Sequence, residues 1–148
     1  MKIPLSFTPK RDRISLICTV RIPPKNLPLP IELVVDTGSP ETFVDEIDLL
    51  KFRIFAKSYH FSNEMFMAGT KVALYEVGKA TMNFRNEQNN LEVVDFGNLK
   101  VAGSAWKRPE AISTGTSILG MNFLLETRLH LFVDPANNLA YLSDGKES

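Results

Sequence analysis

Short apolar stretches with a two-residue period recur along the whole chain, and they constrain its fold more than any other feature. Apolar side chains lie at alternate positions in residues 14–20 and again in residues 80–84. Further apolar runs of strand length cover residues 31–35, 72–77, 91–96, 129–133 and 139–142, and each is bounded by Pro, Gly, Asn or Asp. This period matches the alternation of side chains along a β-strand. Many short strands with frequent turn signals predict an all-β barrel or sandwich.

Helical signals are confined to two short segments. Residues 44–52 carry acidic residues early and Lys51 late, which is the charge order that the helix macrodipole favours. Residues 121–128 follow Gly120 and form the second candidate. Neither segment has the length of a crossover between parallel strands. We therefore expect at most one or two short helices.

The length of 148 residues fits one domain, and we expect a single domain over residues 1–148. A chain of this size buries roughly 70% of its unfolded surface, so it folds without disulfides or metals. The polar residues 86–90 predict a hairpin loop. Residues 97–117 contain few apolar side chains and predict a long connection, which more often serves function than simple linkage.

The charge of the chain is balanced, with 17 Lys and Arg against 17 Asp and Glu. A neutral chain is a poor nucleic-acid binder, so no such partner is expected, and Trp106, Lys107 and Arg108 are interpreted as a solvated loop. The charged residues are nevertheless unevenly distributed: those in residues 1–26 are mostly basic, and those in residues 32–48 are all acidic. This asymmetry fits two solvated surfaces or, alternatively, a self-complementary contact between two copies.

Several chemistries are disfavoured by residue types that are scarce. The single cysteine, Cys18, lies in an alternating apolar stretch and is expected in the core. His60 and His130 are far apart and form no metal-ligand pattern, so no zinc site is predicted. The chain begins without an apolar leader and has no apolar run of membrane-spanning length, so we expect a cytoplasmic protein without membrane contact.

Residues 31–39 form the most unusual segment, because an apolar strand runs directly into Asp36 and then into Gly38 and Ser39. A carboxylate at the end of a buried strand is costly unless it is hydrogen-bonded or functional. The alternative is an Asx-type turn that caps the strand. From this segment alone, both interpretations remain open.

The wider context resembles the retropepsin-like aspartic proteases, the single-domain branch of that class. The segment Val34-Val35-Asp36-Thr37-Gly38-Ser39 and the later Ile118-Leu119-Gly120 are similar to the family's two motifs. The order of strand, motif, flap hairpin, second motif and short helix matches residues 34–39, 67–70, 118–120 and 122–127. The resemblance extends from about residue 12 to residue 142. It implies a closed β-barrel of the retropepsin-like acid protease fold.

The resemblance also implies an aspartic endopeptidase. Such an enzyme uses water as the nucleophile and two carboxylates that share one proton. One Asp-Thr-Gly motif is present, so each subunit of a homodimer would contribute its Asp36, and the substrate would be a polypeptide. Asp95, in a similar segment 59 residues later, is the rival second carboxylate, but it and Asp134 are better explained as turn residues. No metal or organic cofactor is needed.

Further roles come from the family residue by residue. Thr37 would hydrogen-bond across the dimer, Gly38 would permit a tight turn, and Ser39 would hydrogen-bond the Asp36 carboxylate. Gly120 would pack its backbone against the active-site loop. Those four residues support that loop, whereas the substrate-binding flap is assigned to Met67, Ala68, Gly69 and Thr70.

The flap and the segment after the motif depart from the retroviral pattern. The Met- and Phe-rich tip differs from a glycine-rich retroviral flap and could be an ordinary hairpin, and Pro40-Glu41 is an unusual continuation of the first motif.

Two other functions are compatible with parts of the sequence. A non-catalytic dimerisation or peptide-binding module on the same fold would share every feature except the need for an intact Asp-Thr-Gly. Phosphoryl transfer through a nucleophilic aspartate would require a second Asp two residues after Asp36, and Gly38 occupies that position. The aspartic endopeptidase is therefore the principal hypothesis.

Overall fold

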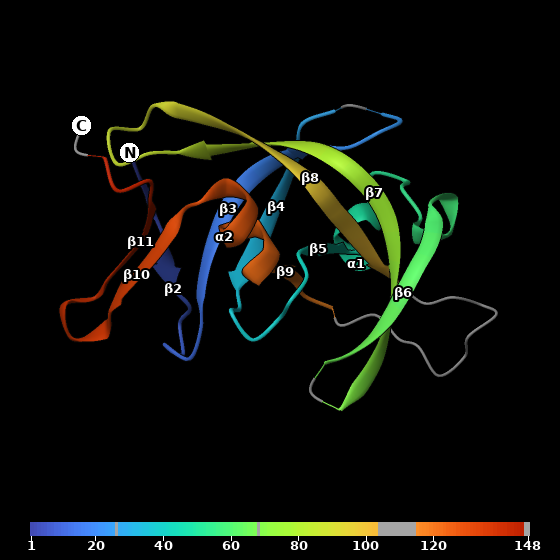
Figure 1. Ribbon diagram of the computed structural model, residues 1–148, viewed down its shortest axis with the longest axis horizontal. Coiled ribbons are helices and arrows are strands. Elements are labelled where there is room, and N and C mark those ends of the chain that lie inside the picture. The colour runs from blue at the N-terminus through green and yellow to red at the C-terminus, as the bar shows by residue number, and fades with distance from the viewer. Residues whose placement is uncertain (26, 68, 104–114, 147–148) are drawn as a thin grey trace.

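The computed structural model describes residues 1–25, 27–67, 69–103 and 115–146, which form a mostly β fold with two short α-helices (Figure 1). The strands are β1 (Lys2–Pro4), β2 (Ser6–Phe7), β3 (Ile14–Arg21), β4 (Leu29–Val35), β5 (Phe43–Asp45), β6 (His60–Met67), β7 (Thr70–Arg85), β8 (Leu91–Gly103), β9 (Ser117–Leu119), β10 (His130–Asp134) and β11 (Leu139–Ser143). The helices are α1 (Glu46–Leu50) and α2 (Met121–Thr127), with 3-10 turns at Ala56–Ser58 and Pro135–Asn137. The expectation of a mostly β chain with one or two short helices is confirmed.

The strands are arranged in two sheets. The larger sheet has eight strands in the order β2-β3-β4-β9-β5-β8-β7-β6, and a further pairing of β3 with β7 links its middle strands into a ring. The smaller sheet has the order β1-β11-β10 and brings the two ends of the chain together, at the upper left of Figure 1. The β6–β7 hairpin extends away from the ring at the lower right.

Strand β9 determines where the two sequence motifs meet. It runs parallel to β4, with Val35 opposite Leu119, and Phe43 of β5 pairs with Ile118 on its other side. All three β9 residues are buried, as expected for a short apolar strand enclosed by neighbours. Because β4 and β9 are parallel and in register, the segments that begin at Asp36 and Gly120 leave the sheet side by side.

The apolar interior is divided into two clusters. The main cluster includes Cys18 and three phenylalanines, and the Phe123 ring contacts Phe84 edge-on and Phe96 at a tilt. Burial raises the pKa of the Cys18 thiol to about 12, so this group is a neutral core residue, as expected. The second cluster consists of Phe43, Val72, Leu74, Ala102 and Ile118, and half-buried Val34, Met65 and Met67 pack against it.

Several expected element boundaries were wrong. The helix expected over residues 44–52 is limited to Glu46–Leu50, because Val44 and Asp45 continue β5 and the Asp45 carboxylate accepts a hydrogen bond from Ile47 N as the helix cap. The long connection expected over residues 97–117 was wrong for residues 97–103, which belong to β8, and for Ser117, which begins β9. Trp106, Lys107 and Arg108 lie outside the described residues.

Two aspartates that were expected to be turn residues behave differently. Asp134 ends β10 and its carboxylate accepts hydrogen bonds from the backbone and side chain of Asn137, which confirms the turn. Asp95 does not end a strand. It lies within β8, opposite Thr81 of β7, and its carboxylate accepts a hydrogen bond from the Thr81 hydroxyl at 3.2 Å.

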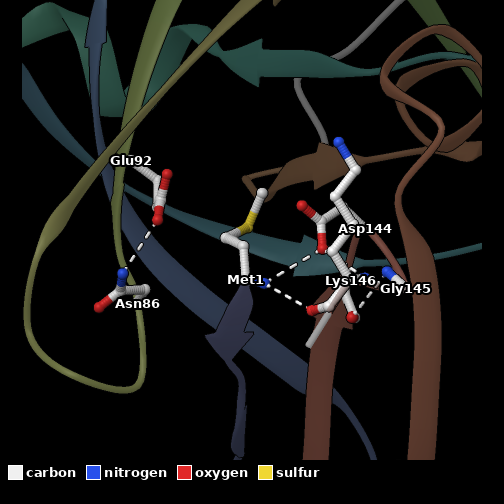
Figure 2. A network of polar contacts seen from close by, with 7 residues as sticks. Met1, Asn86, Glu92, Asp144, Gly145 and Lys146 are labelled. Carbon is white, nitrogen blue, oxygen red and sulfur yellow. Dashed lines mark hydrogen bonds and ion pairs between the residues drawn. The ribbon is translucent and has the colours of Figure 1, made fainter. Parts of the chain in front are cut away.

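Polar contacts close the smaller sheet at the chain ends (Figure 2). The ammonium group of Met1 donates to Asp144 Oδ1 and to the carbonyl oxygen of Lys146, each at 3.1 Å. The pKa of the half-buried Asp144 carboxyl is lowered, first by the hydrogen bond from the backbone N–H of Lys146 and then by the one from this ammonium group. Asn86 donates to Glu92 at 2.9 Å across the nearby β7–β8 turn.

Among the described residues, no helix combines the length and apolar character that a membrane span requires.

The aromatic contact of α2 provides a test of how this helix is held. Replacing Phe123 with alanine removes a fully buried ring that touches Phe84 and Phe96, and we expect the free energy of unfolding to fall by about 3–5 kcal/mol. Urea unfolding followed by circular dichroism measures this change. Leu125→Ala is the matched control, because the Leu125 side chain in the same helix is 72% exposed. Equal losses in the two variants would contradict the packing described here.

Candidate active site

Asp36 lies at the point where β4 leaves the sheet, and its backbone and side chain are both anchored. Its N–H donates to the carbonyl oxygen of Leu119 at 3.0 Å, which continues the β4–β9 pairing by one residue. The Gly38 N–H donates to Asp36 Oδ1 at 2.9 Å, and the Ser39 N–H donates to the Asp36 carbonyl oxygen at 3.1 Å. This is the Asx-type turn that the sequence allowed. The turn holds a half-buried carboxylate at the surface, so capping and chemistry are compatible here.

The loop after Asp36 is fastened to the start of α2. Met121 N–H donates to the carbonyl oxygen of Ser39 at 2.8 Å, and Asn122 N–H donates to that of Pro40 at 3.2 Å. These bonds satisfy backbone donors at a helix N-terminus that would otherwise have no partner. The loop and the helix therefore form one unit.

A fully buried threonine, Thr42, holds this unit from the inside. Its hydroxyl oxygen accepts from Gly120 N–H at 2.9 Å, and the same hydroxyl donates to Asn122 Oδ1 at 2.7 Å. Sequence reasoning missed both Thr42 and Asn122. Asn122 offered a signal, because it is the lone polar side chain in the run from Ile118 to Leu125.

Gly120 has no room for a side chain. A Cβ atom built there would lie 2.1 Å from the carbonyl oxygen of Glu41 and 2.7 Å from that of Ser39. Both neighbours are backbone atoms of the Asp36 loop, so a side chain could not be accommodated by a rotamer change. The close approach of two backbones explains why a glycine is needed at this position.

The other loop residues are placed as follows. Gly38 is exposed, and a Cβ there would lie 3.1 Å from Asp36 Oδ1, so the space beside the carboxylate, rather than a positive φ, favours glycine. Thr37 is exposed at the surface of the single chain. The contact expected of Ser39 was wrong: its hydroxyl donates to the carbonyl oxygen of Glu41 at 2.7 Å. A serine has one proton to donate, so the Gly38 N–H holds the carboxylate instead.

The hairpin assigned to the flap is formed by β6 and β7. Met67 pairs with Thr70, and Gly69 has a φ of +79°, a left-handed conformation that glycine adopts without strain. Ala68 lies outside the described residues. Met65 and Met67 pack on the second apolar cluster together with Val34 and Ile118, each of which lies two residues before a motif residue, Asp36 or Gly120. The part of β6 next to the hairpin tip therefore shares packing with the strands that carry the motifs.

Asp95 is not brought to Asp36 within the chain. Strands β9 and β5 lie between β4 and β8 in the sheet, and the Asp95 side chain is exposed and bonded to Thr81. Within the described parts of the chain, no cluster of three His, Cys, Asp or Glu side chains could hold a metal ion.

Of three comparisons with known proteins, only the comparison with solved structures finds similar proteins. No protein-family model matches the chain, and a search of curated proteins also finds no match. Among solved structures, the retropepsin-like aspartic protease from Rickettsia conorii superposes with a TM-score of 0.60 at 17% identity, over 96% of this chain and 98% of that chain. EIAV protease, in a complex with the inhibitor HBY-793, superposes with a TM-score of 0.49 at 12% identity, over 85% of this chain and 98% of that chain. The chain therefore has a retropepsin-like fold.

Proposed function

We propose that this protein is an aspartic endopeptidase that acts as a homodimer, with one Asp36 from each subunit in a shared active site. The observation that carries the proposal is the position of the intact Asp36-Thr37-Gly38 motif. It lies at the end of β4, fixed to β9 and α2, on a retropepsin-like fold. The fold alone would not define an activity, so the proposal depends on this site.

A second subunit is needed because, among the residues that the structure describes, one chain contributes one suitable carboxylate. Asp95 is engaged on another part of the sheet, and the half-buried Asp36 lies beside exposed Thr37 and Gly38. A two-fold axis through this surface would bring the two Asp36 carboxylates together. Thr37 would then be free to hydrogen-bond the partner's loop and keep the two carboxylates in register.

The proposed chemistry uses two carboxylates about 3 Å apart, which cannot both ionise and therefore share one proton. The ionised carboxylate takes a proton from water as the water oxygen attacks the peptide carbonyl carbon. The protonated carboxyl donates to the carbonyl oxygen, giving a tetrahedral diol. The carboxyl that took the water proton then gives it to the peptide nitrogen, the C–N bond breaks, and the other carboxylate takes a proton from a diol hydroxyl, so that a carboxylic acid and an amine are released and the pair again shares one proton. The proton belongs to the pair, so neither Asp36 has a fixed role.

The β6–β7 hairpin would bind the polypeptide substrate opposite Asp36. Its tip residues Met67, Ala68, Gly69 and Thr70 would close over an extended peptide and exclude water. The peptide would be held by main-chain hydrogen bonds, as extended ligands are on other strand edges.

The test is digestion of a mixed peptide library at acidic through neutral pH, with products identified by mass spectrometry. The proposal expects internal cuts that a transition-state mimic of aspartic proteases suppresses, together with a dimer in analytical ultracentrifugation. A dimer that binds library peptides and cuts none would instead identify a non-catalytic peptide-binding module.

A further inference from the structure

One lysine connects three segments that are far apart in the sequence. Lys100 of β8 has its Nζ atom 2.8 Å from each carboxylate oxygen of Glu41, which follows the Asp36 loop. The same Nζ donates to Asn63 Oδ1 of β6 at 2.7 Å. The Lys100 ammonium group thus joins the loop after Asp36 to the outer strand of the hairpin.

This contact lies on the side of the sheet where the hairpin faces the motif strands. Ala102, two residues after Lys100, belongs to the second apolar cluster, and Met65, two residues after Asn63, packs against it. Side chains two apart on a strand share one face, so Lys100 and Asn63 border that cluster. The backbone N–H of Lys100 also donates to the carbonyl oxygen of Thr42, at 3.2 Å, which fixes the base of its side chain.

The ion pair is largely withdrawn from water. The side chains of Lys100 and Glu41 are 16% and 23% exposed. An exposed ion pair contributes little, whereas removing one partner of a buried pair leaves the other charge without compensation. A second ion pair, Lys71 with Glu64 at 3.4 Å, connects the two strands of the hairpin to each other and does not reach the loop.

We propose that Lys100 is a positioning residue that holds the β6–β7 hairpin at a fixed separation from the Asp36 loop. The inference rests on the proposed function, because it assigns the peptide to the space between these two elements. Lys100 acts through Glu41 on the loop and through Asn63 on the hairpin.

The first experiment measures amide hydrogen exchange in the protein without substrate, which needs no activity. Lys100→Met keeps the apolar stem and removes the ammonium group. We expect amides of residues 60–67 and 36–42 to exchange about tenfold faster, a change in the range of one lost charge-assisted hydrogen bond. Lys2→Met is the control, because it removes the same charge from β1, where Lys2 contacts the Tyr141 ring. Equal exchange in both variants would overturn the proposal.

A second variant separates the two arms of the contact. Asn63→Ala removes the hairpin arm and leaves the ion pair with Glu41, so exchange should increase in residues 60–67 and not in residues 36–42. With a cleavable peptide, we expect both Lys100→Met and Asn63→Ala to raise KM severalfold and to retain the wild-type kcat. Lys100→Arg, which keeps a cation for both acceptors, should restore KM relative to Lys100→Met. Asn63→Ala also decides the question if Lys100→Met does not fold.

The outcomes keep this proposal distinct from the proposed function. If the wild type cuts no peptide but exchange in the variants follows the expected pattern, the positioning role of Lys100 is supported and the endopeptidase is refuted. If the wild type cuts peptides and neither Lys100→Met nor Asn63→Ala changes exchange or KM, the positioning role of Lys100 is refuted and the endopeptidase stands.

Discussion

Replacing Asp36 with asparagine is expected to abolish peptide cleavage, with kcat lowered by at least about 10³-fold. An amide cannot take a proton from water, whereas its oxygen can still accept the Gly38 N–H bond that holds Asp36 Oδ1 at 2.9 Å. The thermal midpoint and the dimer should therefore be preserved. Initial rates on the best library peptide measure the effect, and thermal unfolding checks the fold.

Asp95→Asn is the matched control for this variant. The Asp95 carboxylate is exposed and bonded to Thr81 on a distant part of the sheet, so its replacement should leave kcat unchanged. A comparable loss of activity in Asp95→Asn would favour the rival pairing of two aspartates within one chain.

Mixing subunits tests whether the site is shared. If each site uses one Asp36 from each of two chains, excess Asp36→Asn protein should lower the activity per wild-type molecule. An enzyme with a complete site in one chain would retain that activity.

The second large effect is expected for Gly120→Ala, which should lower the free energy of unfolding by at least about 3 kcal/mol. The added methyl group would lie 2.1 Å from the Glu41 carbonyl oxygen and 2.7 Å from that of Ser39. Moving these atoms apart breaks the bonds from Met121 N–H to Ser39 and from Gly120 N–H to Thr42. Urea unfolding measures the loss.

Gly38→Ala is the comparison for this prediction. Its added methyl group would lie 3.1 Å from one side-chain oxygen, that of Asp36, and no backbone atom lies closer than that. We therefore expect a much smaller loss of stability than for Gly120→Ala. Wild-type stability in Gly120→Ala would contradict the close approach of the two backbones.

Much of the strand pattern could be predicted because burial on one face leaves a local signal. The alternation in residues 14–20 and 80–84 falls within β3 and β7. The merging of residues 72–77 and 80–84 into one strand could not be predicted, because Gly78, normally a turn signal, is accommodated at a shift in the β7–β8 register with a φ of +85°. The start of α1 was also predicted too early. The Asp45 carboxylate caps the helix by accepting from Ile47 N–H, so the helix begins at Glu46.

The site was predictable to the extent that its residues belong to local motifs. Asp36 and Gly120 were identified from short segments, and the structure places those segments side by side. Thr42 and Lys100 were missed, because their partners lie far away in the sequence: 80 residues separate Thr42 from Asn122, and 59 separate Lys100 from Glu41. Contacts of this separation leave no periodicity to detect. Ser39 was given the wrong acceptor, because its hydroxyl donates to the carbonyl oxygen of Glu41, a backbone contact that the motif itself does not indicate.

The pairing of β7 has a mechanical consequence for access to the site. Residues 73–76 of the strand are flanked by both β6 and β8, whereas residues 70–72, within the described part of the chain, pair with β6 alone. The end of the hairpin is thus a two-stranded ribbon that is joined to the larger sheet at one end only. Val72 of this ribbon is fully buried, and Met65 and Met67 pack on the second apolar cluster, so these contacts rather than further strand pairing hold it in place. In the proposed enzyme, a long polypeptide would enter from the side by breaking these apolar contacts and bending the ribbon, while the ring of strands behind it keeps its pairing.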